Sequence, residues 1–173
     1  MEISQGIEIM GKTLWLREEK ILILNDLHLG YEEALYRKGI LVPQFQMRVI
    51  LEDLKLVLER VHPIKVIING DLKHEFGSIL NQEWRDVSVL LDFLMSKVKE
   101  VIIVRGNHDP MIKPMGDKKG IKVVTSYTAG EVMIIHGDEL VRTKAKWIII
   151  GHEHPAITLR EAGKYEKYKC FLK

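Results

Sequence analysis

The stretch Ile21-Leu22-Ile23-Leu24-Asn25-Asp26-Leu27-His28 joins a short apolar run to a carboxylate and an imidazole. An apolar run this short, ending at a polar residue, predicts a buried strand. Asp26 and His28 are two residues apart, so both project to the same side wherever the chain stays extended. The stretch therefore predicts a strand that delivers two side chains suited to metal binding or catalysis at its end.

The same arrangement recurs at four further places along the chain. Each time, a short run rich in β-branched residues is followed closely by Gly, Asn, Asp or His. In open α/β sheets ligands collect at the carboxyl ends of the strands, and glycine allows the tight turns that such a rim requires. We therefore expect one shared site from the residues that follow runs 21–24, 66–68, 101–104, 132–135 and 147–150, namely Asp26, His28, Asp71, Asn107, His108, His136, His152 and His154.

Two longer segments have the spacing of helices that pack on a sheet. Residues 43–61 and 82–98 place apolar side chains on one face, three or four positions apart. Further strands are predicted at residues 7–10, 13–16 and 123–124. Strands that alternate with helices indicate an α/β fold, and the strands after residue 120 predict a second sheet. The expected fold is a four-layer α/β/β/α sandwich, with helices flanking two mixed sheets in a single domain over residues 1–173.

Composition narrows the class of protein. Of 173 residues, 46% are hydrophobic and 29% charged, which is typical of a globular domain, and the net charge of +2 neither requires nor excludes nucleic acid as a partner. Cys170 is the single cysteine, which excludes an intramolecular disulfide and favours a reducing compartment. No apolar run approaches the roughly 20 residues of a membrane span, and no signal peptide is visible. We expect a cytoplasmic protein without a membrane partner, in an oligomeric state that the sequence leaves open.

The candidate ligands determine which chemistry the site supports. They comprise two aspartates, one asparagine and four of the five histidines named above, without a thiolate nearby in the sequence. This set of nitrogen and oxygen donors suits Mn, Fe or Zn, and seven ligands are too many for one ion. Two ions roughly 3.5–4 Å apart that share a carboxylate bind a phosphate between them and activate water. The expected cofactors are two divalent ions, Mn before Zn, Fe, Ni or Mg, and the expected reaction is phosphoester hydrolysis.

The five clusters, read as D-x-H, G-D, G-N-H-[DE], H and G-H-x-H, resemble the signature of the calcineurin-like metallophosphoesterases from Asp26 to His154. This resemblance implies the sandwich fold and a role for each residue. One metal is assigned to Asp26, His28 and His154, the second to Asn107, His136 and His152, and Asp71 bridges them. His108 is the non-ligand imidazole that protonates the leaving group. Arg105 and Asp109 are expected behind the ligands or beside the phosphate.

Departures within the second motif narrow the resemblance. The chain reads Gly70-Asp71-Leu72-Lys73-His74-Glu75, whereas protein Ser/Thr phosphatases continue with an Asp-Arg pair. A histidine three residues after the bridging aspartate resembles the double-strand-break repair nucleases instead, which makes His74 a second catalytic candidate. Residues 27–32, 39–43 and 70–76 look most like small phosphoesterases related to the DNA-ligase-associated metallophosphoesterase. Members of that group continue further past the last motif and add strands to the second sheet, so this chain is expected to be either a short member or a sequence that ends before the natural terminus.

The leading hypothesis is a phosphodiesterase that acts on nucleotides or nucleic acid. The alternatives are a phosphomonoesterase that acts on a small metabolite and, from another class, a scaffold that has lost its chemistry. Substrate choice resides in the loops around the metals, here residues 31–42, 73–81 and 110–120. The last loop carries Lys113, Lys118 and Lys119, for which a solvated surface is favoured over phosphate contact.

Overall fold

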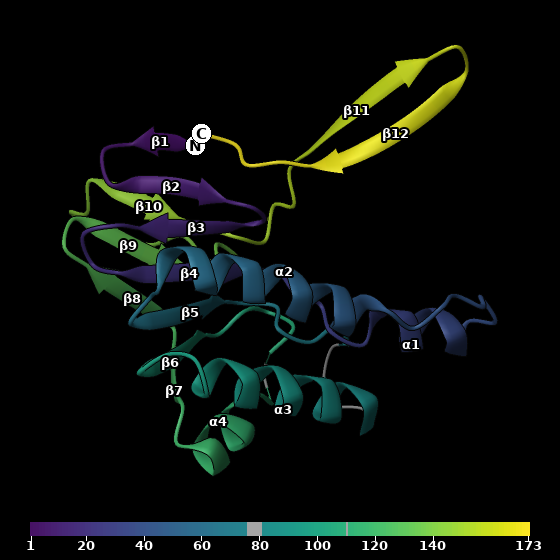
Figure 1. Cartoon of the computed structure of the whole chain (residues 1–173), viewed down its shortest axis with the longest axis horizontal. Coiled ribbons are helices and arrows are strands. Elements are labelled where there is room, and N and C mark those ends of the chain that lie inside the picture. The colour runs from purple at the N-terminus through teal and green to yellow at the C-terminus, as the bar shows by residue number, and fades with distance from the viewer. Residues whose placement is uncertain (76–80, 110) are drawn as a thin grey trace.

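A computed structural model of the protein describes residues 1–75, 81–109 and 111–173 (Figure 1). Its helices are α1 (Tyr31–Arg37), α2 (Gln46–Val61), α3 (Asn81–Met95) and α4 (Lys113–Lys119). Its strands are β1 (Glu2–Ser4), β2 (Ile7–Met10), β3 (Thr13–Leu16), β4 (Ile21–Asn25), β5 (Lys65–Asn69), β6 (Glu100–Val104), β7 (Lys122–Val124), β8 (Ser126–Ala129), β9 (Val132–Ile135), β10 (Trp147–Ile149), β11 (Ala156–Glu161) and β12 (Lys164–Lys169). Residues 76–80 of the expected loop 73–81, and residue 110 of the loop 110–120, lie outside the described residues.

Seven strands form the large sheet, in the order β1-β2-β3-β4-β5-β6-β7. The pairs from β1 to β4 are antiparallel, whereas β4, β5, β6 and β7 are parallel neighbours. The parallel strands are connected through α2, α3 and α4 in turn, and crossovers of this kind are almost always right-handed. The order β4-β5-β6-β7 across the sheet is also the order along the chain, without a reversal. Three crossovers of the same hand therefore place all three helices on the same face of the sheet.

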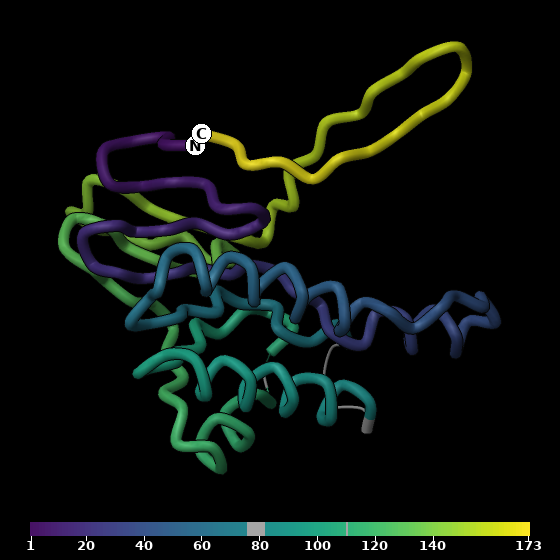
Figure 2. Tube along the Cα trace, in the orientation of Figure 1, coloured from purple at the N-terminus to yellow at the C-terminus, as the bar shows by residue number. Residues whose placement is uncertain are grey.

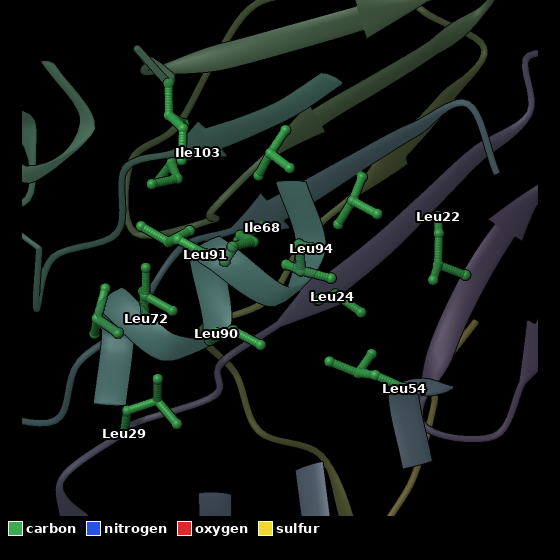
Figure 3. Packing of buried hydrophobic residues seen from close by; sticks show 14 of the residues in the cluster. Leu22, Leu24, Leu29, Leu54, Ile68, Leu72, Leu90, Leu91, Leu94 and Ile103 are labelled. Atoms are coloured by element: carbon green, nitrogen blue, oxygen red, sulfur yellow. The ribbon is translucent and has the colours of Figure 1, made fainter. Parts of the chain in front are cut away.

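Buried apolar side chains fill the space between these helices and the sheet (Figure 3). Leu54 of α2 and Leu91 of α3 belong to one cluster with Leu24 and Ile68 of the sheet, and Leu91 and Ile68 are fully buried. The apolar positions of each helix recur every three or four residues, so they line one stripe that faces the strands. Packing in this layer fixes the positions of the helices relative to the sheet. It thereby fixes where the loops that connect strands and helices begin and end.

The opposite face of the large sheet packs against a small mixed sheet, in the order β10-β9-β8. Side chains alternate across a strand, so Ile23 and Ile67 point away from the helices and join a second cluster. That cluster contains Ile134 of β9 and Ile149 of β10, and every one of its members lies in a strand. The second cluster therefore holds the two sheets face to face.

The hairpin of β11 and β12 projects away from the sandwich (Figures 1 and 2). The two strands pair antiparallel from Ala156 with Lys169 to Glu161 with Lys164, and nearly all of their side chains are exposed. After β12 the chain runs back toward β1 (Figure 2), and Nζ of Lys173 donates to the carbonyl of Ile3 at 2.7 Å, so the two chain ends lie close together. The hairpin therefore lies at the surface and follows the last predicted motif directly in the sequence.

The predicted α/β class, with two mixed sheets packed together and flanking helices, is confirmed. All eight predicted strands and both predicted helices appear, with ends that differ by a few residues. The helices α2, α3 and α4 cover the large sheet, and the described residues beyond β10 form a hairpin.

Candidate metal centre

The carboxyl ends of five strands meet at one end of the two sheets. β4 and β5 are parallel and end in register at Asn25 and Asn69, so the residues that follow them turn toward the same place. The donor atoms of Asp26, His28, Asp71 and His154 all lie within 4.8 Å of one another, and so do those of Asp71, His136 and His152. Asp71 belongs to both groups. The two groups are therefore neighbours that share one carboxylate.

Asn107 completes the second group from the end of β6. Its side-chain Oδ1 lies 3.0 Å from Nε2 of His136 and 3.2 Å from Nδ1 of His152. An amide oxygen and two imidazole nitrogens that converge in this way suit one divalent ion of the Mn, Fe or Zn type. All seven side chains predicted as ligands are thus brought together by the fold.

The backbone at these positions has an unusual conformation. Asp26, His28, Asp71, His152 and His154 have φ angles of +50°, +44°, +47°, +62° and +44°. Residues with a side chain rarely adopt this left-handed region, which costs about 1–3 kcal/mol each and occurs mainly at functional sites. Five of the seven candidate ligands therefore sit at sharp turns where strand ends bend their side chains inward.

Hydrogen bonds between the turns hold them together. The backbone N–H of His28 donates to the carbonyl of Asp71 at 2.9 Å, and that of His152 donates to the carboxylate of Asp26 at 3.1 Å. The N–H of His108 donates to Oδ1 of Asp71 at 3.0 Å. Each ligand-bearing turn is thus tied to another one, so none takes up its conformation alone.

Two asparagines connect the large sheet to the small sheet beside the ligands. Nδ2 of Asn25, at the end of β4, donates to the carbonyl of Ile150 at 3.0 Å. Nδ2 of Asn69, at the end of β5, donates to the carbonyl of Ile135 at 2.8 Å. Ile135 precedes His136 and Ile150 lies two residues before His152, so each amide holds the strand end that supplies a ligand.

Asp71 is the most strongly constrained carboxylate of the site. Its residue is 2% exposed, and burial alone would raise its pKa. The contact of Oδ1 with Nε2 of His136 at 3.3 Å, together with the N–H of His108, outweighs that effect and holds the pKa at about 2. Asp71 is therefore ionised at neutral pH, which is the charge state that metal binding requires of a carboxylate.

In His28, burial outweighs the effect of the neighbouring charge on the pKa. Burial lowers its pKa to about 4 against the attraction of Asp71, and the neighbouring imidazoles of His108 and His154 lower it further. Its Nε2 lies 3.2 Å from Nε2 of His154, and its buried Nδ1 has no hydrogen-bond partner among the described residues. His28 is therefore neutral at pH 7 and has the lone pair that a metal ion requires.

The two predicted catalytic histidines lie at the edge of the first group. Nδ1 of His108 donates to the backbone carbonyl of His74, and the two rings stack with centroids 6.0 Å apart. A carbonyl only accepts hydrogen bonds, so this contact places a proton on Nδ1 and leaves Nε2 to exchange one. Nε2 of His108 lies 3.9 Å from Oδ2 of Asp71.

Asp109 and Arg105 take different positions. Asp109 is fully buried, and its carboxylate accepts N–H groups from Leu72, Lys73 and Gly106, which joins the turn after β5 to the turn after β6. Burial raises the pKa of Asp109 despite these bonds. Arg105 is exposed and lines a pocket with Thr125, Ser126 and His136, on the side of the second group.

The sequence of residues 19–139 matches the family described as calcineurin-like phosphoesterase, which covers most of the chain. The chain belongs to the calcineurin-like phosphoesterase family. This membership makes the protein a metal-dependent phosphoester hydrolase, and the clustered aspartates and histidines form its divalent-metal site. Among the described residues, no helix has the length and apolar character needed to cross a lipid bilayer.

Comparison of structures supports the same fold. The calcineurin-like phosphoesterase described above resembles the nuclease MPE of Pseudomonas putida with a TM-score of 0.64 and 21% sequence identity. The similarity covers 86% of this chain and 68% of that nuclease. No curated protein matches the sequence.

Three residues help to build the site although the sequence did not predict this role for them. Asn25 and Asn69 precede motif residues, but the sequence did not predict that their amides join two sheets. Gln46 of α2 donates through its amide to the carbonyls of Leu27 and His28, at 3.1 and 3.2 Å. A glutamine at the start of a helix is common, so only the fold shows that it holds a ligand loop.

Substitution of Gly70 tests how closely the chain of this calcineurin-like phosphoesterase packs around the candidate metal ligands. A Cβ atom at Gly70 would lie 2.0 Å from Nδ1 of His136, whereas one at Gly39 meets nothing within 4 Å. Both glycines have nearly the same φ, +77° and +78°. Each substitution by Ala should cost about 1–2 kcal/mol of unfolding free energy for its backbone, and only Gly70→Ala should also displace His136 and reduce bound metal.

Urea unfolding and metal analysis of the purified variants measure the two effects separately. Gly39→Ala is the matched control for the backbone conformation. A Gly70→Ala protein with the metal content of the wild type would show that His136 is not held at this place by close packing.

Proposed function

We propose that the protein is a two-metal phosphodiesterase that acts on nucleotides or nucleic acid. The observation that carries the proposal is the carboxylate of Asp71, which belongs to both groups of donor atoms. One ion would be held by Asp26, His28 and His154, and the other by Asn107, His136 and His152, with Asp71 between them. Because the donors are nitrogen and oxygen without a thiolate, we propose Mn as the preferred ion.

Two divalent ions, when bound, supply a phosphate-binding centre that lowers the pKa of a water molecule and balances the charge of the transition state. The chain provides the geometry for this chemistry. Asp71 is held ionised by His136 and by the N–H of His108, and His28 is held neutral by burial. No proton therefore has to leave either side chain before metal binds at neutral pH.

His108 has the position of a general acid for the leaving group. Its Nδ1 proton is directed to the carbonyl of His74, so Nε2 is the atom that gives a proton to a leaving alkoxide. His28 lies beside it, with ring centroids 5.0 Å apart and nearly perpendicular. We propose that His108 is catalytic and that no metal is bound by it.

His74 favours a diester as the substrate. It follows Asp71 by three residues and its ring stacks on His108, so a second imidazole is available next to the leaving-group side. Burial lowers the pKa of His74, which keeps this ring neutral at physiological pH. The similar fold of a protein named as a nuclease agrees with this proposal, although fold alone does not set the substrate.

Hydrolysis of two substrates with the same leaving group tests the proposal. Mn-loaded protein should release 4-nitrophenol faster from bis(4-nitrophenyl) phosphate than from 4-nitrophenyl phosphate. Metal-free protein is the control, and it should release none from either. Robust hydrolysis of the monoester without hydrolysis of the diester would favour the phosphomonoesterase, and no hydrolysis of any phosphoester would favour the scaffold.

The roles of His108 and Asp71 separate in a second measurement. His108→Ala should lower kcat by about 100- to 10,000-fold while the metal content stays near that of the wild type, since removing a general acid has that effect. Asp71→Ala should lose both activity and metal, because its carboxylate serves both ions. Kinetics with a dinucleotide beside metal analysis decides between the roles, because its leaving group is an alkoxide that needs a proton, whereas 4-nitrophenolate leaves without one. Equal metal loss in both variants contradicts the roles.

A further inference from the structure

Tyr31 is an exposed aromatic residue next to the metal centre. It is the first residue of α1 and 47% exposed, and it belongs to neither hydrophobic cluster. Its ring centroid lies 4.9 Å from that of His74, with the two planes at 75°. A large aromatic side chain at this place serves neither core packing nor any part of the catalysis proposed above.

Tyr31 extends a series of rings that begins at the metal ligands. The ring of His74 lies 5.6 Å from that of His28 and 6.0 Å from that of His108, and Tyr31 lies beyond His74. Only Tyr31 in this series is largely open to solvent. The series therefore leads from the place where a phosphate would bind to an aromatic surface that a substrate group can reach.

The position of Tyr31 is fixed by the backbone rather than by its own side chain. Its N–H donates to the carbonyl of His28 at 3.3 Å. Gly30 precedes it with a φ of +88°, and a Cβ atom there would lie 2.4 Å from Cγ of Glu83. The chain therefore makes a tight turn from ligand to helix that only glycine allows, and Tyr31 begins the helix immediately beside the site.

The helix that begins at Tyr31 is itself anchored to the ligand loop. The carboxylate of Glu32 accepts the N–H groups of Phe45 and Gln46, at 3.0 and 2.9 Å, at the start of α2. The side chain of Gln46 in turn donates to the carbonyls of Leu27 and His28. α1, α2 and the ligand loop thus form one connected unit, and a ring carried by it keeps its distance from the metal centre.

We infer that Tyr31 stacks on the nucleobase of the nucleotide whose phosphate occupies the metal centre. The inference rests on the proposed function and names the group that makes a phosphoester a good substrate. Base–aromatic stacking is tolerant of sequence and occurs where proteins bind single-stranded nucleic acid.

Binding of thymidine 5′-monophosphate and of inorganic phosphate to the Mn-loaded protein tests the inference without hydrolysis. Calorimetry should give about ten-fold weaker binding of the nucleotide to Tyr31→Leu, which is about 1.4 kcal/mol, with phosphate affinity unchanged, because the variant loses the ring on which the base stacks. Tyr31→Phe should bind like the wild type because it keeps the ring. Tyr36→Leu is the matched control, since Tyr36 lies on the same helix and is 57% exposed.

Three results would overturn the stacking role. Tyr31→Leu could weaken both ligands equally, it could weaken neither, or Tyr31→Phe could lose as much nucleotide affinity as Tyr31→Leu. A wild-type protein that binds the nucleotide more tightly than phosphate but hydrolyses no diester supports stacking and contradicts the proposed function. Diester hydrolysis by a protein that binds nucleotide and phosphate equally well supports the proposed function and contradicts stacking.

Discussion

Two asparagine side chains, one at the end of β4 and one at the end of β5, join the large sheet to the strand ends of the small sheet that supply ligands. Asn25 and Asn69 lie opposite each other in the parallel register, and each donates to a carbonyl of the small sheet beside a ligand. Three of the candidate ligands come from the small sheet and the others from the large one. The metal centre therefore exists only while the two sheets keep this relative position.

The candidate metal ligands combine strained backbone conformations with hydrogen bonds that stabilise them. Five candidate ligands adopt left-handed backbone conformations, which an isolated turn would not maintain. Their N–H groups and carboxylates bond to the neighbouring turns, and Asp109 joins two of those turns from beneath. Burial and close contacts also set the charges, with Asp71 ionised and His28 neutral. These two ligands are thus in the charge state that a divalent ion requires, whereas the same contact with Asp71 raises the pKa of His136 despite its burial.

The sequence predicted the fold as far as strong local patterns reach. Apolar runs such as 21–24 and 101–104 are short, β-branched and sharply bounded, so their strands and the polar residues after them could be assigned. α1 and α4 have seven residues each, too few for a helical period to be recognised, and both were missed. β11 and β12 bury almost nothing, so no apolar pattern marks the hairpin as a pair. The roles of Asn25, Asn69 and Gln46 depend on partners far away in the chain, and residue type alone does not reveal them.

A single carboxylate shared by two ions is the central claim. Paramagnetic resonance of protein loaded with Mn tests it most directly, in combination with metal analysis of the same sample. If Asp71 bridges the site, the protein binds two Mn ions per chain and their spectrum shows magnetic exchange between neighbouring ions. One Mn per chain, or two ions with the spectrum of isolated Mn, would contradict the account.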